Sequence, residues 1–167
     1  FYVLCEMDEN GYHPLGYSSR EINTKEQNIL SCIVILPPFQ KRGYGKLLIS
    51  LSYEIARRKK APGSPEKPLS KLGLKSFESF WKERIITVLK DHPDINNIEH
   101  IVDFTGISED DIIDILEKCD FAKYLSVKSR IVVYQDKLKK AADELKRKKT
   151  KNGNQFNPRM LLWKPDD

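Results

Sequence analysis

The segment "PPFQKRGYGKLLISLSYEIARRKK" (residues 37–60) joins two closely spaced glycines, Gly43 and Gly45, to a strongly patterned helix. The apolar residues of residues 45–60 that recur at helical spacing are Leu47, Leu48, Leu51, Tyr53 and Ile55. Glycines just before a helix let the backbone approach a ligand, and the helix N-terminus favours an anion. The segment therefore predicts a helix over residues 45–60 that is preceded by a phosphate-binding loop.

Two common phosphate-binding motifs do not fit this loop. A Walker A motif needs glycine where Gln40 stands and Ser or Thr where Leu47 stands. The dinucleotide-binding fingerprint needs a third glycine where Leu48 stands. Nucleotide hydrolysis and dinucleotide binding both lose support, whereas two glycines in an ordinary turn remain an alternative.

The flanking segments predict a mixed fold. Residues 29–38, "ILSCIVILPP", form a nearly continuous apolar run, which is typical of a strand buried on both faces. Residues 61–73, "APGSPEKPLSKLG", predict a structured loop without regular helix or strand. Residues 1–22 alternate around the turn "ENG" and predict a β-hairpin. Residues 76–92 predict an amphipathic helix begun by Ser76, whose apolar stripe is Phe77, Phe80, Trp81, Ile85, Val88 and Leu89.

The C-terminal part is compact and mostly helical. Residues 97–121 predict two short helices around "FTG", with Ser108 as N-cap of the second helix and Asp111 at its N3 position. Residues 122–135 predict a two-stranded wing, and residues 136–149 a last helix. The inward side chains of that helix are Leu138, Ala141, Ala142 and Leu145. After a polar link, Leu161, Leu162 and Trp163 are expected to dock on the body.

Composition limits the classes of function. The 167 residues are 40% hydrophobic and 32% charged, and no window approaches the ~20 continuous apolar residues of a membrane span. Cys5, Cys32 and Cys119 form no CxxC pair, and the three histidines are isolated, so neither disulfides nor a metal site are expected. The net charge of +5, with basic runs near residues 57–60 and 146–151, favours an acidic partner, although basic helix ends explain much of it. The start at "FYVLC", without Met, suggests a fragment that begins within a domain.

Strand, "QKRGYG" (residues 40–45) and helix together resemble the pattern by which GNAT-like acetyltransferases hold the pyrophosphate of acetyl-CoA. "SCIVILPPFQKRGYGKLLISLSYE" followed by "GSPEKPLSKLG" closely resembles the catalytic core of MYST-family histone (lysine) acetyltransferases. "FYVL", "SFESFW", "TGIS" and the final "LLW" extend the similarity over nearly the whole chain. In that family a zinc finger and an autoacetylated lysine lie upstream of "FYVL". Lys71 departs from the family, which usually has an acidic residue there.

The resemblance implies an α+β fold: a GNAT-like acetyltransferase core with a mixed sheet and flanking helices, then a winged-helix-like C-terminal subdomain. We place the core at residues 1–91 and the subdomain with its docking tail at residues 92–167. The resemblance further implies acetyl-CoA as co-substrate, histone tails or nucleosomes and subunits of a larger complex as partners, and a nuclear location. No metal is expected in this fragment.

Site residues follow from the same resemblance, which assigns the general base to Glu66 and places Cys32 at the reacting centre. The residues expected to bind acetyl-CoA are Ile33, Val34, Ile35, Lys41, Arg42, Gly43, Tyr44, Gly45, Lys46 and Ser70. Cys32 is either an acyl acceptor in a ping-pong route or a neighbour during direct attack. We favour direct attack, because a thiol buried in the apolar strand without a cationic partner ionises poorly.

Two other classes of function remain open. One is a non-catalytic winged-helix module that binds DNA or chromatin, although its presumed second helix, "EDDIIDILEK", is acidic and therefore unsuited to phosphates. The other is an acyl-CoA-binding scaffold, which would have no need for a base such as Glu66.

Overall fold

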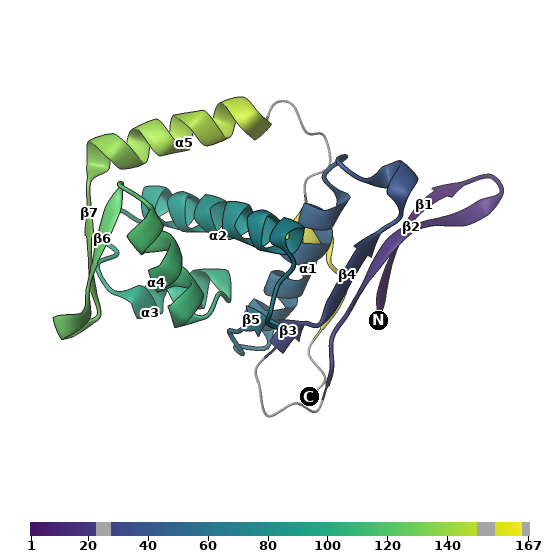
Figure 1. Ribbon diagram of the computed structural model, residues 1–167, viewed down its shortest axis with the longest axis horizontal. Coiled ribbons are helices and arrows are strands. Elements are labelled where there is room, and N and C mark those ends of the chain that lie inside the picture. Colours follow the sequence, from purple (N-terminus) through teal and green to yellow (C-terminus); the bar gives the residue numbers. More distant parts are fainter. Residues whose placement is uncertain (23–27, 150–155, 165–167) are drawn as a thin grey trace.

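The computed structural model describes residues 1–22, 28–149 and 156–164, and it is a mixed α+β structure (Figure 1). Its strands are β1 (Tyr2–Asp8), β2 (Gly11–Ser19), β3 (Asn28–Leu30), β4 (Cys32–Ile35), β5 (Ser64–Pro65), β6 (Ala122–Leu125) and β7 (Arg130–Val133). Its α-helices are α1 (Tyr44–Arg58), α2 (Lys71–Asp91), α3 (Ile98–Thr105), α4 (Glu109–Lys118) and α5 (Gln135–Lys149). The expected α+β class is confirmed, and the GNAT-like and winged-helix assignments stay predictions.

The predicted hairpin is present, and it forms part of a small sheet. β1 and β2 pair antiparallel, and β2 also pairs antiparallel with β4, which gives the strand order β1-β2-β4. The apolar run at residues 29–38 is not one strand, because it divides at Ser31 into β3 and β4. β3 pairs in parallel with β5 in a second sheet. The two halves of one extended segment thus pair with different neighbours.

Helices α1 and α2 form the centre of the molecule. The predicted stripe of α2 is buried, and its Trp81 indole donates a 2.6 Å hydrogen bond to the Tyr53 hydroxyl of α1. The predicted start of α2 at Ser76 is wrong: the helix begins at Lys71, and Ser70 is its N-cap, with its Oγ accepting the Gly73 N–H at 3.1 Å. Ser76 instead donates to the Leu72 carbonyl within the helix. The Ser70 cap satisfies one of the first backbone N–H groups of a helix that begins at Lys71.

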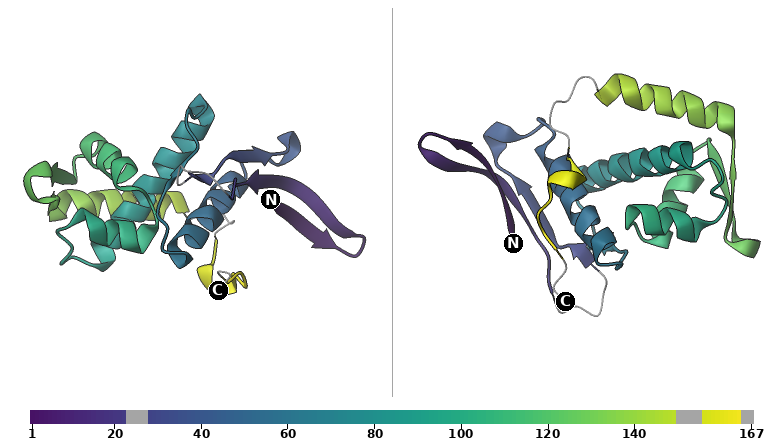
Figure 2. Two further views of the ribbon diagram at one scale, coloured as in Figure 1. Left: turned by 90° about the horizontal axis from the view of Figure 1, so that it is seen from below. Right: turned by 180° about the vertical axis from the view of Figure 1, so that it is seen from behind.

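The C-terminal segment follows the predicted element order. Ser108 caps α4 by accepting the Asp111 N–H, and Gly106 ends α3 with a φ of 72°. β6 and β7 pair antiparallel, and the four predicted inward residues of α5 are buried in or packed against the core. One hydrophobic cluster contains residues from both sides of residue 91, among them Tyr53, Phe80, Ile101 and Ile131. In Figure 2 the β1–β2 hairpin projects at one end of the molecule and β6–β7 lie at the other.

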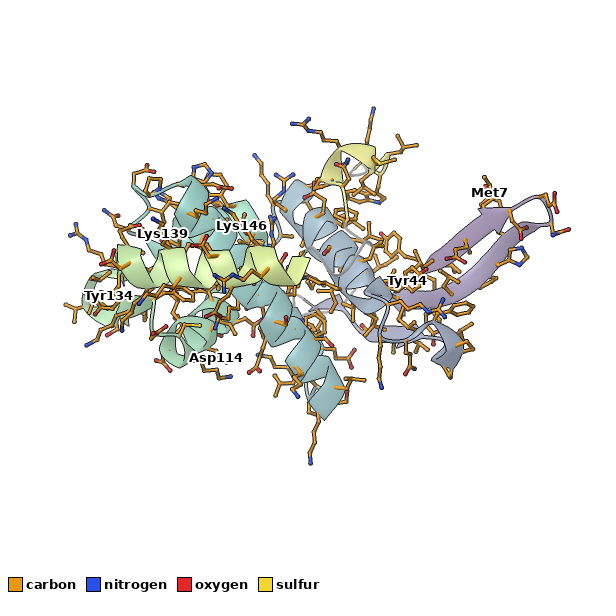
Figure 3. All side chains as sticks on the ribbon, turned by 90° about the horizontal axis from the view of Figure 1, so that it is seen from above. Met7, Tyr44, Asp114, Tyr134, Lys139 and Lys146 are labelled. Carbon is orange, nitrogen blue, oxygen red and sulfur yellow. The ribbon has the colours of Figure 1, made fainter. Side chains whose placement is uncertain are left out.

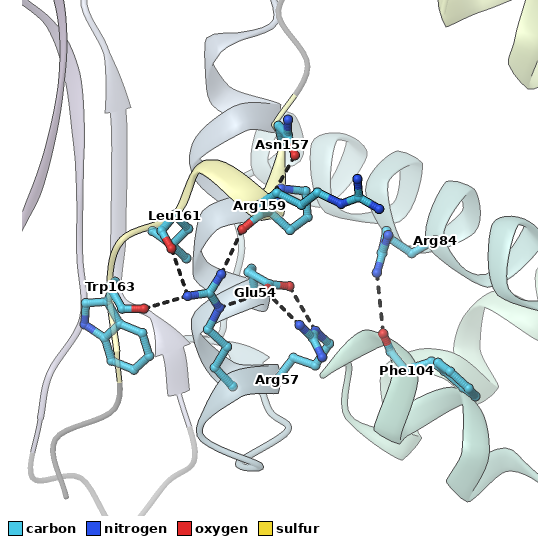
Figure 4. A network of polar contacts seen from close by, with 10 residues as sticks. Glu54, Arg57, Arg84, Phe104, Asn157, Arg159, Leu161 and Trp163 are labelled. Carbon is cyan, nitrogen blue, oxygen red and sulfur yellow. Dashed lines mark hydrogen bonds and ion pairs between the residues drawn. The ribbon is translucent and has the colours of Figure 1, made fainter.

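The C-terminal tail docks on α1, but differently from the prediction. Arg58 of α1 donates hydrogen bonds to the carbonyls of Pro158, Leu161 and Trp163, at 2.8, 3.0 and 2.6 Å (Figure 4). The Trp163 ring lies 5.4 Å from the Lys59 ammonium. Leu162 is 92% exposed, so its predicted docking is wrong, since polar contacts to the tail backbone hold the segment. The polar link at residues 150–155 lies outside the described residues.

Candidate active site

Glu66 lies at the end of a short strand that is tied to β3. β5 pairs with β3, and the Glu66 N–H donates a 2.8 Å hydrogen bond to the Leu30 carbonyl. Leu30 is buried in the core, whereas Glu66 is exposed. Because Cys32 follows Leu30 by two residues, the main chain brings the two residues that we predicted to be catalytic into one neighbourhood.

Cys32 is exposed, which corrects the expectation of a buried thiol. The exposure of β4 alternates from residue to residue, with Cys32 and Val34 exposed and Ile33 and Ile35 partly buried. A strand covered on both faces would bury all four side chains, so the apolar composition overstated the burial. Poor ionisation caused by burial is therefore no argument against a role for this thiol.

One backbone edge of β4 is available for a ligand. In the described part of the chain, β4 has β2 as its single ladder partner. The Leu36 N–H donates to the Leu15 carbonyl of β2. In an antiparallel pair, the N–H and C=O groups of successive residues point alternately toward the partner strand and away from it. The N–H and C=O groups of Ile33 and Ile35 therefore point away from β2. The Ile35 carbonyl accordingly accepts a 2.9 Å bond from the Gln40 side-chain amide. Of the three predicted backbone donors, the Val34 N–H points toward β2, and the N–H groups of Ile33 and Ile35 point toward the opposite edge.

The glycine loop leads from β4 into α1. Gly43 is the N-cap of α1 and has a φ of 90°, which a glycine adopts without strain. Its helix has neither a side-chain cap nor an acidic residue in the first turn. A Cβ built on Gly45 would meet only Ile35, at 3.9 Å, so the chain itself does not demand glycine there. The N–H groups of this first turn and the helix dipole both favour an anion over a cation at this position.

The side chains of the loop are held by neighbouring elements. The Tyr44 hydroxyl donates a 2.7 Å bond to Glu6 of β1, and Figure 3 shows Tyr44 at the start of α1 beside the hairpin. The Lys46 ammonium pairs with Glu83 of α2. The Arg42 guanidinium lies 5.8 Å from the centre of the Phe39 ring, and Lys41 is exposed with a φ of 61°. The predicted pyrophosphate-binding residues thus surround one helix start, with Lys46 already in an ion pair.

Comparison with known proteins gives a family for the whole of this arrangement. The model of the MOZ/SAS family matches residues 1–161. The chain belongs to the MOZ/SAS family. It is 41% identical to "Histone acetyltransferase Tip60 homolog" of Caenorhabditis elegans, over 100% of this chain and 37% of that relative. It is 36% identical to "Histone acetyltransferase ESA1" of Saccharomyces cerevisiae, over 99% of this chain and 36% of that relative. It is 43% identical to "Histone acetyltransferase MOF" of Drosophila melanogaster, over 74% of this chain and 15% of that relative.

The match confirms the predicted family, since relatives of this chain are named as members of the MYST family. The chain spans little more than a third of the length of the first relatives named above. The residues matched by the MOZ/SAS family include Glu66, Cys32 and the glycine loop.

Three residues around this site make contacts that were not foreseen. Gln40 ties the glycine loop to β4, and Ser70 caps α2 in addition to its predicted role toward acetyl-CoA. Asp111 accepts hydrogen bonds from Ser64 and Lys67, on either side of Glu66. The sequence placed Asp111 only as an N3 residue, because nothing local reveals a contact across 44 residues.

Two features are absent from the described part of the chain. Within residues 1–22, 28–149 and 156–164, no three His, Cys, Asp or Glu side chains gather closely enough to hold a metal ion. No helix in these ranges combines the length and the apolar character that crossing a membrane requires.

Proposed function

We propose that this chain carries the acetyl-transfer site of a histone lysine acetyltransferase, with acetyl-CoA as the acetyl donor and Glu66 as the general base. The observation that carries the proposal is the hydrogen bond from the Glu66 N–H to the carbonyl of Leu30 in β3, two residues before Cys32, the first residue of β4. After β4, the chain continues to the start of α1, where the N-cap Gly43 has no side chain to cap the helix. The names of the relatives support histones as the substrate class.

The residues present fit acetyl-CoA. The first turn of α1 offers backbone N–H groups and contains no acidic residue of its own, and Gly45 leaves space at its Cα. We assign the pyrophosphate to Lys41, Arg42, Gly43, Tyr44, Gly45 and Lys46, and the acetyl-bearing arm to the backbone edge at Ile33 and Ile35. Ser70, at the start of α2, is a further contact in this proposal.

Acetyl-CoA supplies a thioester that an amine can attack. A substrate lysine has a pKa near 10.4, so keeping its amine neutral at pH 7 costs about 4.6 kcal/mol. Glu66 would accept the ammonium proton, and the neutral amine nitrogen would then form a bond to the acetyl carbon. The carbon–sulfur bond would break, and the second proton lost by the nitrogen would pass to the departing sulfur, so that the coenzyme leaves as a thiol. A backbone N–H at Ile33 or Ile35 stabilises the negative charge that develops on the carbonyl oxygen.

The cellular setting follows from the same proposal. Histone tails on nucleosomes are the substrates, the nucleus is the location, and further subunits of an acetyltransferase complex are partners. Figure 3 shows Lys139 and Lys146 on α5, and both are exposed and suit an acidic partner. Direct binding of DNA by α4 has less support, because its first turn holds Glu109, Asp110 and Asp111.

The test is acetyl transfer from labelled acetyl-CoA to histone tail peptides by the full-length protein that carries this chain. Glu66→Gln should lower kcat by at least about 100-fold without changing the Kd for acetyl-CoA measured by calorimetry. Glu117→Gln, an exposed change on α4, is the matched control and should leave both constants unaltered.

Cys32→Ala separates the two routes. If most activity remains, a direct attack is supported, and if transfer is lost while fold and cofactor binding persist, Cys32 carries the acetyl group. Transfer that persists in Glu66→Gln would refute the assigned base. Absence of transfer by the unmodified protein on every tail would favour a binding module.

A further inference from the structure

Asp111 is a buried carboxylate whose contacts lie outside its own helix. It is 1% exposed and occupies the third position of α4. An acidic residue at this position often reaches back to the N-cap of its helix. Here the carboxylate accepts a hydrogen bond from the Ser64 hydroxyl and, at 3.0 Å, one from the Lys67 ammonium. The Ser64 hydroxyl also lies 2.8 Å from the Ser108 hydroxyl, the N-cap of α4.

The residues that contact Asp111 lie on both sides of Glu66 in the sequence. Ser64 precedes Glu66 by two residues and Lys67 follows it directly, so one carboxylate holds the chain on both sides of the proposed base. The main chain repeats the connection, because the Gly63 N–H donates to Gly106 at 3.1 Å and the Gly63 carbonyl accepts from Ser108 at 3.2 Å. Glu66 itself is held by the hydrogen bond from its N–H to the Leu30 carbonyl of β3.

The charges add a second effect. Lys67 is the nearest cation to Glu66 along the chain, and its side chain is about half exposed, at 54%. The carboxylate of Asp111 engages this ammonium, so the ammonium is not available to pair with Glu66. Loss of this partner would leave the buried Asp111 carboxylate without its cation, which is costly.

We propose that Asp111 is a positioning residue for acetyl transfer, which fixes the Glu66 segment through Ser64 and Lys67 and keeps the Lys67 ammonium away from the base. This inference rests on the proposed function. According to this proposal, the start of α4 supports the active site in addition to packing in the hydrophobic core.

The experiment measures kcat, KM for the histone peptide and Kd for acetyl-CoA in the full-length protein. The variants are Asp111→Asn, which keeps the shape and removes the charge, Lys67→Met, Lys67→Arg, and the combination of Asp111→Asn with Lys67→Met. Asp110→Asn and Lys75→Met are matched controls that remove the same charges at exposed positions of α4 and α2. Thermal unfolding of each variant reports on the fold.

The expected result is a fall in kcat of about 10- to 100-fold in Asp111→Asn, with the Kd for acetyl-CoA within twofold of the unmodified protein. Lys67→Met should also lower kcat, Lys67→Arg should restore most of it, and the double variant should be no slower than Asp111→Asn alone. A purely structural role would lower the unfolding temperature and affect all three constants together.

The following results would contradict the inference. If Asp111→Asn matches Asp110→Asn in kcat, or if its loss follows the loss of acetyl-CoA binding, Asp111 does not position the base. If Asp111→Asn fails to fold, Lys67→Met decides: a kcat equal to that of Lys75→Met overturns the inference. If the inference alone is wrong, the unmodified protein still transfers acetyl groups and Glu66→Gln is still inactive. If the proposed function is wrong, the unmodified protein transfers no acetyl groups, and both proposals are overturned.

Discussion

The two ends of helix α1 are built in opposite ways. At the C-terminal end, the buried Glu54 accepts hydrogen bonds from Arg57 and Arg58, and Arg58 binds three carbonyls of the tail (Figure 4). At the N-terminal end, Gly43 provides no side-chain cap and the first turn has no acid. The helix is therefore anchored by the protein at one end and left with donors for a ligand at the other.

The largest expected effect concerns Gly106, which packs on the C-terminal end of α1. Its φ is 72°, and an added Cβ would lie 3.0 Å from the Tyr53 carbonyl oxygen and 3.2 Å from the Arg57 nitrogen. Gly106→Ala should lower the free energy of unfolding by about 2–4 kcal/mol, because backbone strain and overpacking add. Urea denaturation measures the loss.

Gly11→Ala is the control for strain without crowding. Gly11 also has a positive φ, of 116°, but an added Cβ meets nothing within 4 Å. Its loss should be about 1–2 kcal/mol. Equal losses in the two variants would show that the anchored end of α1 tolerates movement.

The second prediction concerns the pH dependence of stability at Glu54. Burial raises the pKa of this carboxyl, but hydrogen bonds from Arg57 and Arg58 outweigh burial and hold the pKa below its usual 4.5. The group therefore stabilises the fold fully above pH 4.5, and the contribution disappears as the pH falls through the lower folded-state pKa. Glu54→Gln should cost about 1–2 kcal/mol at pH 7 and progressively less below pH 4.

Urea denaturation at pH 7 and at lower pH values measures this difference. The exposed Glu117→Gln provides the control at both ends of the range. A cost for Glu54→Gln that stays constant as the pH falls would mean that the carboxylate charge does not anchor this end of α1.

How far the sequence predicts this molecule depends on the range of the contacts. The stripe of α2, the cap at Ser108 and the turn at Gly106 were predictable, because they depend on residues within one or two turns. The start of α2 was placed too late, since proline and glycine before Ser70 suggested a continuing loop. Local patterns thus determine that helices form more reliably than where they begin.

The site shows the same limit. The glycine loop was recognisable, because its residues are contiguous and precede a helix. The exposure of Cys32 depends on one face of β4 being left uncovered. The contact of Asp111 with Lys67 depends on the start of α4 lying beside β5, where Ser64 is also hydrogen-bonded to Asp111. Such contacts are set by tertiary structure and leave no periodic pattern in the sequence.

The third prediction tests the open end of α1 through Gly45. Since its Cβ would meet only Ile35 at 3.9 Å, Gly45→Ala should leave stability unchanged or raise it by about 0.5–1 kcal/mol. The affinity for acetyl-CoA should nevertheless fall about tenfold, because a methyl group obstructs the approach of pyrophosphate to the backbone. Calorimetry and urea denaturation on one sample separate the two effects.

Ser76→Ala is the matched control, because it raises the helix propensity at an exposed position of α2, away from the first turn of α1. It should leave the affinity unchanged. An unaltered affinity in Gly45→Ala would place the pyrophosphate elsewhere.

The smallest expected effect concerns Glu83, which pairs with Lys46 at the open end of α1. If Lys46 binds pyrophosphate, this pair has to rearrange when acetyl-CoA enters, and an ion pair with a partly exposed lysine is weak. Glu83→Gln should therefore tighten the binding of acetyl-CoA by about two- to threefold at low salt, and the gain should shrink as salt is raised. Glu78→Gln removes the same charge from α2 at the ion pair with Lys118, and it should leave the affinity unchanged. Weaker binding in Glu83→Gln would mean that Glu83 holds Lys46 in its binding position, so that this side of the open end is also built by the protein before the ligand arrives.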